Sequence, residues 1–179
     1  MHYANFKIMR KITSVFAFFT AVINAQTFPN PYCGITEPDE VVVEEITSIS
    51  FNNVVINNIN DTDVLIDFTA TSVPVASGQT YSLKVYGNTQ GNFETNIVAF
   101  IDWNNNGVLN DAGEIYEVGT LTNSTGTDGI FVAMDIPVPT TANNAITRIR
   151  ITKTYTDEES VAVINPCAIS FSPFGFGEF

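Results

Sequence analysis

The sequence predicts an all-β fold, an antiparallel β-sandwich of about seven or eight strands that follows a cleaved signal peptide. Apolar and polar residues alternate with period two in residues 82–86 and 148–152, as they do in strands that bury one face. Turn-forming pairs such as Ser77-Gly78 and Asp128-Gly129 separate the candidate strands at short intervals. Many short strands at this spacing are typical of a sandwich.

The first 25 residues have the layout of a secretory signal peptide. Three basic residues precede an apolar run, and Asn24-Ala25 stands before Gln26, so we expect cleavage after Ala25. The apolar run is shorter than the roughly 20 residues that span a bilayer. We therefore expect a secreted or cell-surface protein that is not inserted in a membrane after cleavage.

The remaining residues divide into a lead-in segment, residues 26–44, and one β-sandwich domain, residues 45–179. The lead-in contains three prolines and ends in an apolar and acidic stretch. The chain after the signal peptide is long enough for one core but not comfortably for two. We expect strands at residues 45–51, 64–71, 82–86, 96–103, 114–118, 131–137 and 148–152.

The charge of the chain excludes several classes of partner. The full sequence has a formal net charge of −12, and removal of residues 1–25 leaves four basic and nineteen acidic residues, or −15. Such a surface repels nucleic-acid backbones and anionic membranes. It attracts divalent cations. The alternative is that the net negative charge only keeps the protein soluble.

The two cysteines, Cys33 and Cys167, lie near the two ends of the exported chain. An oxidising compartment favours a disulfide between them, which would clip the ends of the domain together. Two buried free thiols are the alternative.

Residues 102–114, DWNNNGVLNDAGE, have the composition of a calcium loop. Oxygen-bearing groups recur around Gly107, which can adopt the positive φ that a tight cation-binding bend requires. Asn110 could contribute through a water. The expected ligands are Asp102, Asn104, Asn106, the backbone carbonyl of Val108, Asp111 and Glu114.

The loop would be a calcium loop of another lineage than the helix-loop-helix hand, and an alternative without a metal stays open. The helix-loop-helix calcium hand places glutamate at position 12, whereas this loop has Gly113 there and Glu114 one residue later. The Asn-Gly pair is also a common hairpin turn, and a tight turn between two strands needs no metal. A tight turn, however, gives no reason for three carboxylates to lie close together, because like charges repel.

Catalysis has little support in the sequence. The single histidine is His2, within the predicted signal peptide, so no serine-histidine or cysteine-histidine nucleophile can be built. Carboxylates such as Glu94 and Asp135 could still converge as a glycosidase pair. We expect a non-catalytic protein.

Several stretches, read in order, resemble the GEVED domain, a module of exported proteins of Bacteroidetes-type bacteria. They are Tyr32-Cys33, EEITSISFNN, GQTYSLKVYG, FIDWNNNGVLNDAGEIY, IPVP and ITRIRITKTY. The family usually has more aspartate in the loop, where this chain has Asn106 and Val108. Its closing Gly-Glu-Val-Glu-Asp stretch enters a final strand, whereas this sequence reads Gly177-Glu178-Phe179 and stops. The resemblance therefore implies a truncated gene product that lacks the last strand and the further domains of the same polypeptide.

These observations predict a calcium-binding β-module that serves adhesion or presentation within a larger exported protein. Its partner would be an extracellular glycan or protein. The alternative is a carbohydrate-binding accessory module of an exported hydrolase, in which Trp103 and the tyrosines stack on sugar rings. Trp103 follows an apolar strand, however, where an aromatic side chain is more often packed than displayed.

Overall fold

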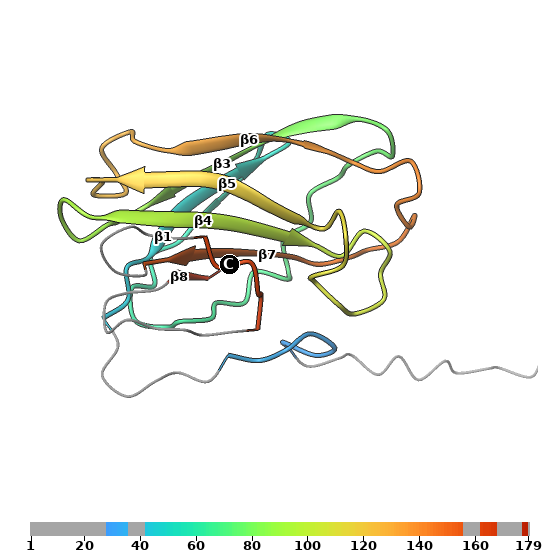
Figure 1. The fold of residues 1–179 in the computed structure, drawn as a ribbon, viewed down its shortest axis with the longest axis horizontal. Coiled ribbons are helices and arrows are strands. Elements are labelled where there is room, and N and C mark those ends of the chain that lie inside the picture. Colours follow the sequence, from blue (N-terminus) through green and yellow to red (C-terminus); the bar gives the residue numbers. More distant parts are fainter. Residues whose placement is uncertain (1–27, 36–41, 156–161, 168–176, 179) are drawn as a thin grey trace, which may run out of the picture.

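The computed structural model describes residues 28–35, 42–155, 162–167 and 177–178, and within them the chain forms strands and no helix (Figure 1). The fold is an all-β sandwich of two four-stranded antiparallel sheets, as the sequence predicts. The strands are β1 (Ile46–Phe51), β2 (Val54–Asn57), β3 (Thr80–Gly87), β4 (Glu94–Ile101), β5 (Ile115–Thr122), β6 (Val132–Pro137), β7 (Ile149–Thr154) and β8 (Gly177–Glu178).

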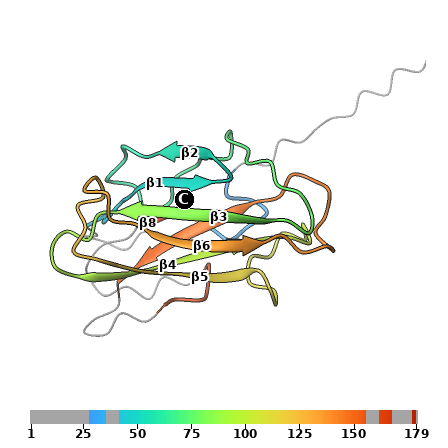
Figure 2. The ribbon, with the colours of Figure 1, turned by 90° about the horizontal axis from the view of Figure 1, so that it is seen from above.

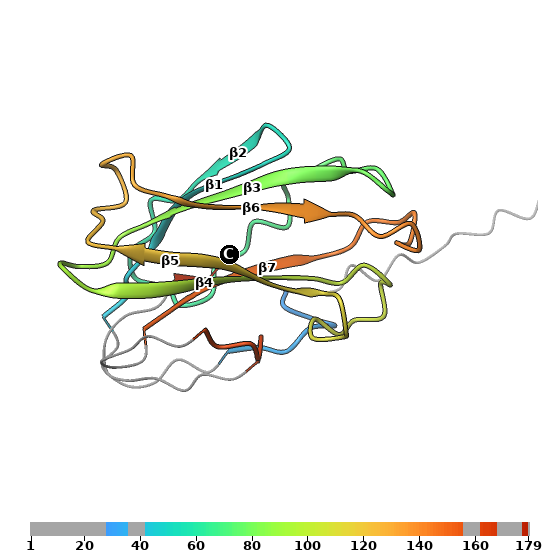
Figure 3. The ribbon, with the colours of Figure 1, turned by 45° about the horizontal axis from the view of Figure 1, so that its top comes forward.

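The two sheets lie face to face, which Figures 2 and 3 show from two directions. The first sheet has the strand order β2-β1-β3-β6, and the second has the order β5-β4-β7-β8. The chain crosses between the sheets after β3, after β5 and after β6. On one side of the sandwich β5 and β6 approach each other closely, so that side is closed by strands.

The main core lies between the sheets and is built by alternating positions of each strand. Ile46, Leu83, Ile136 and Ile151 are fully buried there. Strand β4 departs from alternation, because every residue from Thr95 to Ile101 is buried. A second apolar cluster explains the departure, since residues 28–35 cover the outer side of the second sheet (Figure 3).

The disulfide between Cys33 and Cys167 is present, as predicted, with its Cα atoms 5.7 Å apart across 134 residues of sequence. Arg150 supports it from β7: its Nη1 donates to Cys33 Sγ at 3.1 Å and to Pro166 O at 2.7 Å, and its Nη2 donates to Cys33 O at 2.7 Å. The lead-in segment is thereby attached to the second sheet.

Six of the seven expected strands are present with small shifts at their ends. The prediction of a strand at residues 64–71 is wrong. Asp67 accepts hydrogen bonds from the N–H and hydroxyl of Thr69, and Thr71 N–H donates to Phe68 O. These bonds form a turn that interrupts the strand pattern. Residues 58–79 instead cross the open side of the sandwich without a strand.

Two strands were not among those expected, β2 and the two-residue β8. Strand β2 returns antiparallel to β1 through Asn52 and Asn53, which have φ values of 44° and 62°. Two successive positive φ values are typical of a two-residue hairpin turn, and asparagine tolerates them. The Asn-Asn pair was the available signal.

Two further expectations concern the ends of the chain: the absence of the last strand and the presence of a signal peptide. Gly177–Glu178, the beginning of the closing stretch, pairs with Lys153 and Thr152 of β7 as strand β8. The predicted signal peptide, residues 1–25, lies outside the described residues. In the described part, no helix is long and apolar enough to cross a membrane.

Candidate metal centre

Residues 102–114 form the connection of the β4–β5 hairpin. The last ladder pair is Phe100 with Ile115, and Ile101 N–H donates to Glu114 O at 2.9 Å to close the loop. The connection is therefore a wide loop and not the tight turn that was the alternative. Gly107 has a φ of 84°, in agreement with the positive φ that the sequence of the loop predicted.

Asp102 organises this loop from a fully buried position. Its Oδ1 accepts the N–H of Asn106 at 3.0 Å, and its Oδ2 accepts the N–H of Gly107 at 2.8 Å. The hydroxyl of Tyr32 also donates to Oδ2 at 2.8 Å. A carboxylate oxygen has two lone pairs, so Oδ1 retains one that could face a cation.

Asp111 lies across the loop and gathers the two asparagines. Its Oδ2 accepts the side-chain amides of Asn104 at 3.0 Å and of Asn106 at 2.7 Å. These two hydrogen bonds lower the pKa of Asp111. Rotation of either amide by half a turn exchanges its nitrogen for its oxygen, so the same positions could present oxygen atoms to a cation.

Glu114 is the least satisfied group of the loop. It is 3% exposed, and its Oε1 accepts the N–H of Asn104 at 3.3 Å, whereas its Oε2 is buried without a hydrogen-bond partner. Burial raises the pKa of Glu114, and the charges of Asp102 and Asp111 raise it further. A buried carboxylate oxygen without a donor is costly unless a cation or proton neutralises it.

The remaining predicted ligand, Val108, could contribute only through its backbone. Its side chain is 41% exposed, and its N–H donates to Asn106 Oδ1 at 2.8 Å. Among the described residues no three Asp, Glu, Cys or His side chains form a group that could hold a metal ion. A cation in this loop would therefore depend on amide and carbonyl oxygens in addition to carboxylates, which is a donor set that suits calcium.

Sequence reasoning missed three residues that hold the loop. Tyr32 is 7% exposed, and its burial and its bond to Asp102 raise its pKa to about 12. The Thr147 hydroxyl donates to the backbone oxygen of Asp102, and the Arg148 guanidinium lies 5.0 Å from the centre of the Tyr32 ring. Of these three residues, only Tyr32 could have been found from the sequence. It is adjacent to Cys33, and a disulfide fixes the position of its neighbours.

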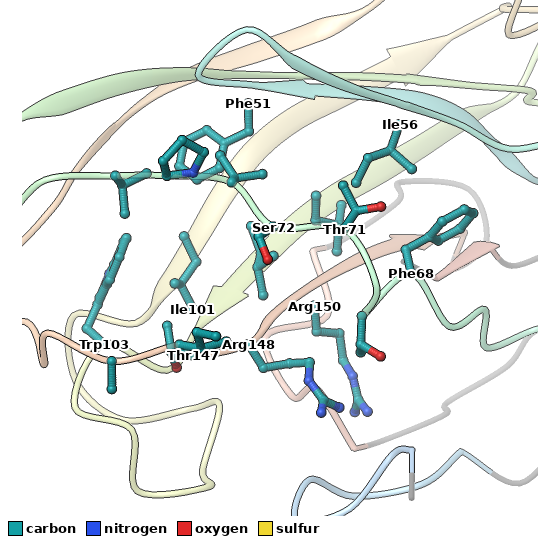
Figure 4. Close-up of a pocket in the computed structure, with 18 of the residues that line it drawn as sticks. Phe51, Ile56, Phe68, Thr71, Ser72, Ile101, Trp103, Thr147, Arg148 and Arg150 are labelled. Carbon is teal, nitrogen blue, oxygen red and sulfur yellow. The ribbon is translucent and has the colours of Figure 1, made fainter. Parts of the chain in front are cut away.

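Trp103 is packed and not displayed. Its side chain is 6% exposed, and its indole N–H donates to the Tyr116 hydroxyl at 2.8 Å. Figure 4 shows it on the wall of a cavity between the sheets. Because its ring is covered, Trp103 does not present a face on which a sugar ring could stack.

The fold and the loop together define a β-sandwich module whose β4–β5 connection is rich in oxygen donors. Residues 96–179 match the family model described as the GEVED domain, and this part of the chain is a GEVED domain. The match includes the loop and strands β4 to β8, which are the second sheet and β6 of the first. No curated protein and no solved structure matches the chain.

Proposed function

We propose that the protein is a secreted or cell-surface, non-catalytic module in which residues 102–114 bind calcium, and that it serves adhesion or presentation within a larger exported protein. The observation that carries the calcium proposal is Glu114 Oε2, a buried carboxylate oxygen without a hydrogen-bond partner. Burial, together with the adjacent charges of Asp102 and Asp111, makes the ionised form of Glu114 unfavourable. A divalent cation would remove that penalty for all three carboxylates.

The donors available to the cation are sufficient in number. Calcium takes six to eight oxygens, and the loop offers carboxylate oxygens, two amide oxygens and a backbone carbonyl. The ligands proposed are Asp102, Asn104, Asn106, Val108, Asp111 and Glu114. Since Asp102 also binds Tyr32, an ion in the loop would link the ends of β4 and β5 to the lead-in segment.

The expected role of calcium is stabilisation. Two asparagines lower the negative charge of the site, so we expect a weak site of the kind found in extracellular modules, with a Kd of roughly 10⁻⁴ to 10⁻³ M. At about 2 mM calcium and a Kd near 10⁻⁴ M, binding adds about 1.8 kcal/mol to the free energy of unfolding. Titration calorimetry and thermal unfolding in calcium and in EDTA test this. Equal melting temperatures and no heat of binding would contradict it.

A carbohydrate-binding function remains the second candidate, at a different place from Trp103. The rings of Tyr86 and Phe131 lie 5.2 Å apart, and Lys84 Nζ lies 5.1 Å from the centre of the Phe131 ring. Phe131 is 43% exposed. The ladder register places Ser48 opposite Tyr86 and therefore on the same face of the first sheet.

A ring face beside hydroxyl and ammonium donors suits the alternating C–H and O–H groups of a sugar. A glycan array compares the protein with Tyr86→Ala and Phe131→Ala variants. Binding that both variants lose would support the accessory-module function. An array without binding to any glycan would contradict it and would leave adhesion to a protein ligand.

A further inference from the structure

A cavity of about 870 Å³ opens between the two sheets on the side away from β5 and β6 (Figure 4). It lies among the first sheet, the second sheet and residues 65–77, which are part of the segment 58–79 that crosses the open side of the sandwich. Its apolar lining residues include Phe51, Ile56, Phe68, Ile101 and Trp103.

The chemistry of the wall differs from that of the rest of this acidic chain. Although the chain has nineteen acidic residues, none of those that the structure describes lines the cavity. Its charged lining residues are Arg148 and Arg150, whose guanidinium groups point toward residues 28–35 in Figure 4. They donate there to Pro29 O at 3.3 Å and to Cys33 O at 2.7 Å.

The polar groups that line the cavity are otherwise uncharged. Thr71 and Ser72 come from the crossing segment, and Figure 4 shows Ser72 on the cavity side, facing Ile101 and Thr147. Hydroxyl groups of this kind can orient one polar atom of a ligand without attracting an ion. Because both guanidinium groups bind backbone oxygens of residues 28–35, the rest of the lining favours a mainly apolar molecule.

The crossing segment is held at a distance from the core by hydrogen bonds. Asn52 Nδ2 donates to Pro74 O at 2.6 Å, and Ala76 N–H donates to the Tyr81 hydroxyl at 3.0 Å. Thr71 N–H donates to Phe68 O at 2.8 Å within the segment. The first two bonds attach the segment to the β1–β2 turn and to β3, so the segment cannot move into the space without breaking them.

The volume of about 870 Å³ lies in the range of small-molecule sites. Protein interiors are close-packed, with few voids larger than a water molecule, and an apolar cavity binds apolar molecules in preference to water. Small-molecule sites have volumes of about 300 to 1,000 Å³ and mainly apolar, partly aromatic walls. We propose that this cavity binds an uncharged, lipid-like or aromatic small molecule between the two sheets.

Trp103 provides a built-in reporter for this site, because it is the only tryptophan of the chain and it lines the cavity. The probe is N-phenyl-1-naphthylamine, an uncharged aromatic molecule that fluoresces strongly in apolar surroundings. We expect saturable binding of one probe per protein, with energy transfer from Trp103 to the probe. Dodecan-1-ol should displace the probe, and maltose should not.

Two variants locate the probe. Ser72→Phe and Thr71→Phe add bulk at the cavity wall and should weaken probe binding about tenfold, which corresponds to about 1.4 kcal/mol. Val55→Phe is the matched control, since Val55 is 57% exposed on the first sheet and does not line this cavity. It should bind the probe as the unchanged protein does. Thermal unfolding of each protein establishes that it is folded.

Three outcomes would overturn the proposal: no saturable binding by the unchanged protein, equal binding by folded blocking variants, or binding without energy transfer from Trp103. The titration is made in calcium and in EDTA. Probe binding in both solutions supports the cavity independently of the cation, whereas a calcium titration without heat contradicts only the proposed metal site.

Discussion

The Tyr32 hydroxyl lies 2.8 Å from Asp102 Oδ2, although the two residues are 70 positions apart. This bond connects the lead-in segment, which the adjacent disulfide holds, to the first residue of the candidate calcium loop. The same carboxylate accepts the N–H groups of Asn106 and Gly107. The shape of the loop therefore depends on a residue far away in the sequence.

Replacement of Tyr32 by phenylalanine should lower the free energy of unfolding by about 1.5 to 3 kcal/mol, the range for hydrogen bonds to charged groups. Urea unfolding measures the change. Tyr86→Phe is the control, because Tyr86 is a partly exposed tyrosine of the first sheet and its variant should change stability by less than about 0.5 kcal/mol. Equal effects of the two variants would contradict a structural role for the Tyr32–Asp102 bond.

Tyr32 also predicts a pH dependence at the alkaline end. Its folded-state pKa is about 12, above the ordinary value of 10.0, so the unfolded chain loses this proton first as the pH rises. Stability from this group is therefore complete below pH 10.0 and falls as the pH rises toward about 12. The difference in unfolding free energy between the protein and Tyr32→Phe should shrink across that window. A constant difference would contradict the raised pKa.

Glu114→Gln should affect the melting temperature differently in the absence and in the presence of calcium. In EDTA at neutral pH the variant should melt at the same or a higher temperature, because it removes a buried charge whose pKa is raised. In millimolar calcium the unchanged protein should gain stability and the variant should gain little. Thermal unfolding in both solutions measures the effects. An equal gain by both proteins would remove Glu114 from the site.

The two loop glycines offer a matched pair. Gly107 and Gly113 have φ values of 84° and 88°, so alanine strains the backbone at both. A Cβ at Gly107 would also meet Pro31 Cγ at 3.2 Å, whereas one at Gly113 meets nothing within 4 Å. Gly107→Ala should therefore destabilise the protein more than Gly113→Ala, which should cost about 1 kcal/mol. Denaturant unfolding of the two variants compares them directly. Equal losses of unfolding free energy would mean that Pro31 moves aside without cost.

The buried ion pair between Lys153 and Glu44, with Nζ and Oε2 2.7 Å apart, should respond strongly to removal of one partner. Lys153→Met leaves the Glu44 carboxylate buried without its cation and should destabilise the protein by about 3 to 5 kcal/mol. The double variant with Glu44→Leu should recover most of that loss, because no uncompensated charge then remains. Unfolding free energies of the three proteins test this. A double variant no more stable than the single one would show that packing dominates.

Much of the fold could be predicted from short-range patterns, and the errors have local physical causes. The expected strand at residues 64–71 has strand-like composition, but Asp67 binds the backbone and hydroxyl of Thr69 and forms a turn. Strand β2 was missed because its turn uses two asparagines and no glycine. Both errors concern residues whose side chains compete with the backbone for hydrogen bonds, and such competition depends on the final geometry.

The sequence by itself determined the sandwich class, the pairing of the two cysteines and the place of the loop, because period-two alternation, the number of cysteines and the position of Gly107 are local or countable properties. Only the tertiary structure decided that Tyr32 supports Asp102, that Glu114 keeps a buried oxygen without a partner, and that a cavity lies between the sheets. The reason is physical. Burial and hydrogen-bond partners arise when distant segments pack together. The spacing of residues within one segment therefore does not show which of its polar groups will lack a hydrogen-bond partner.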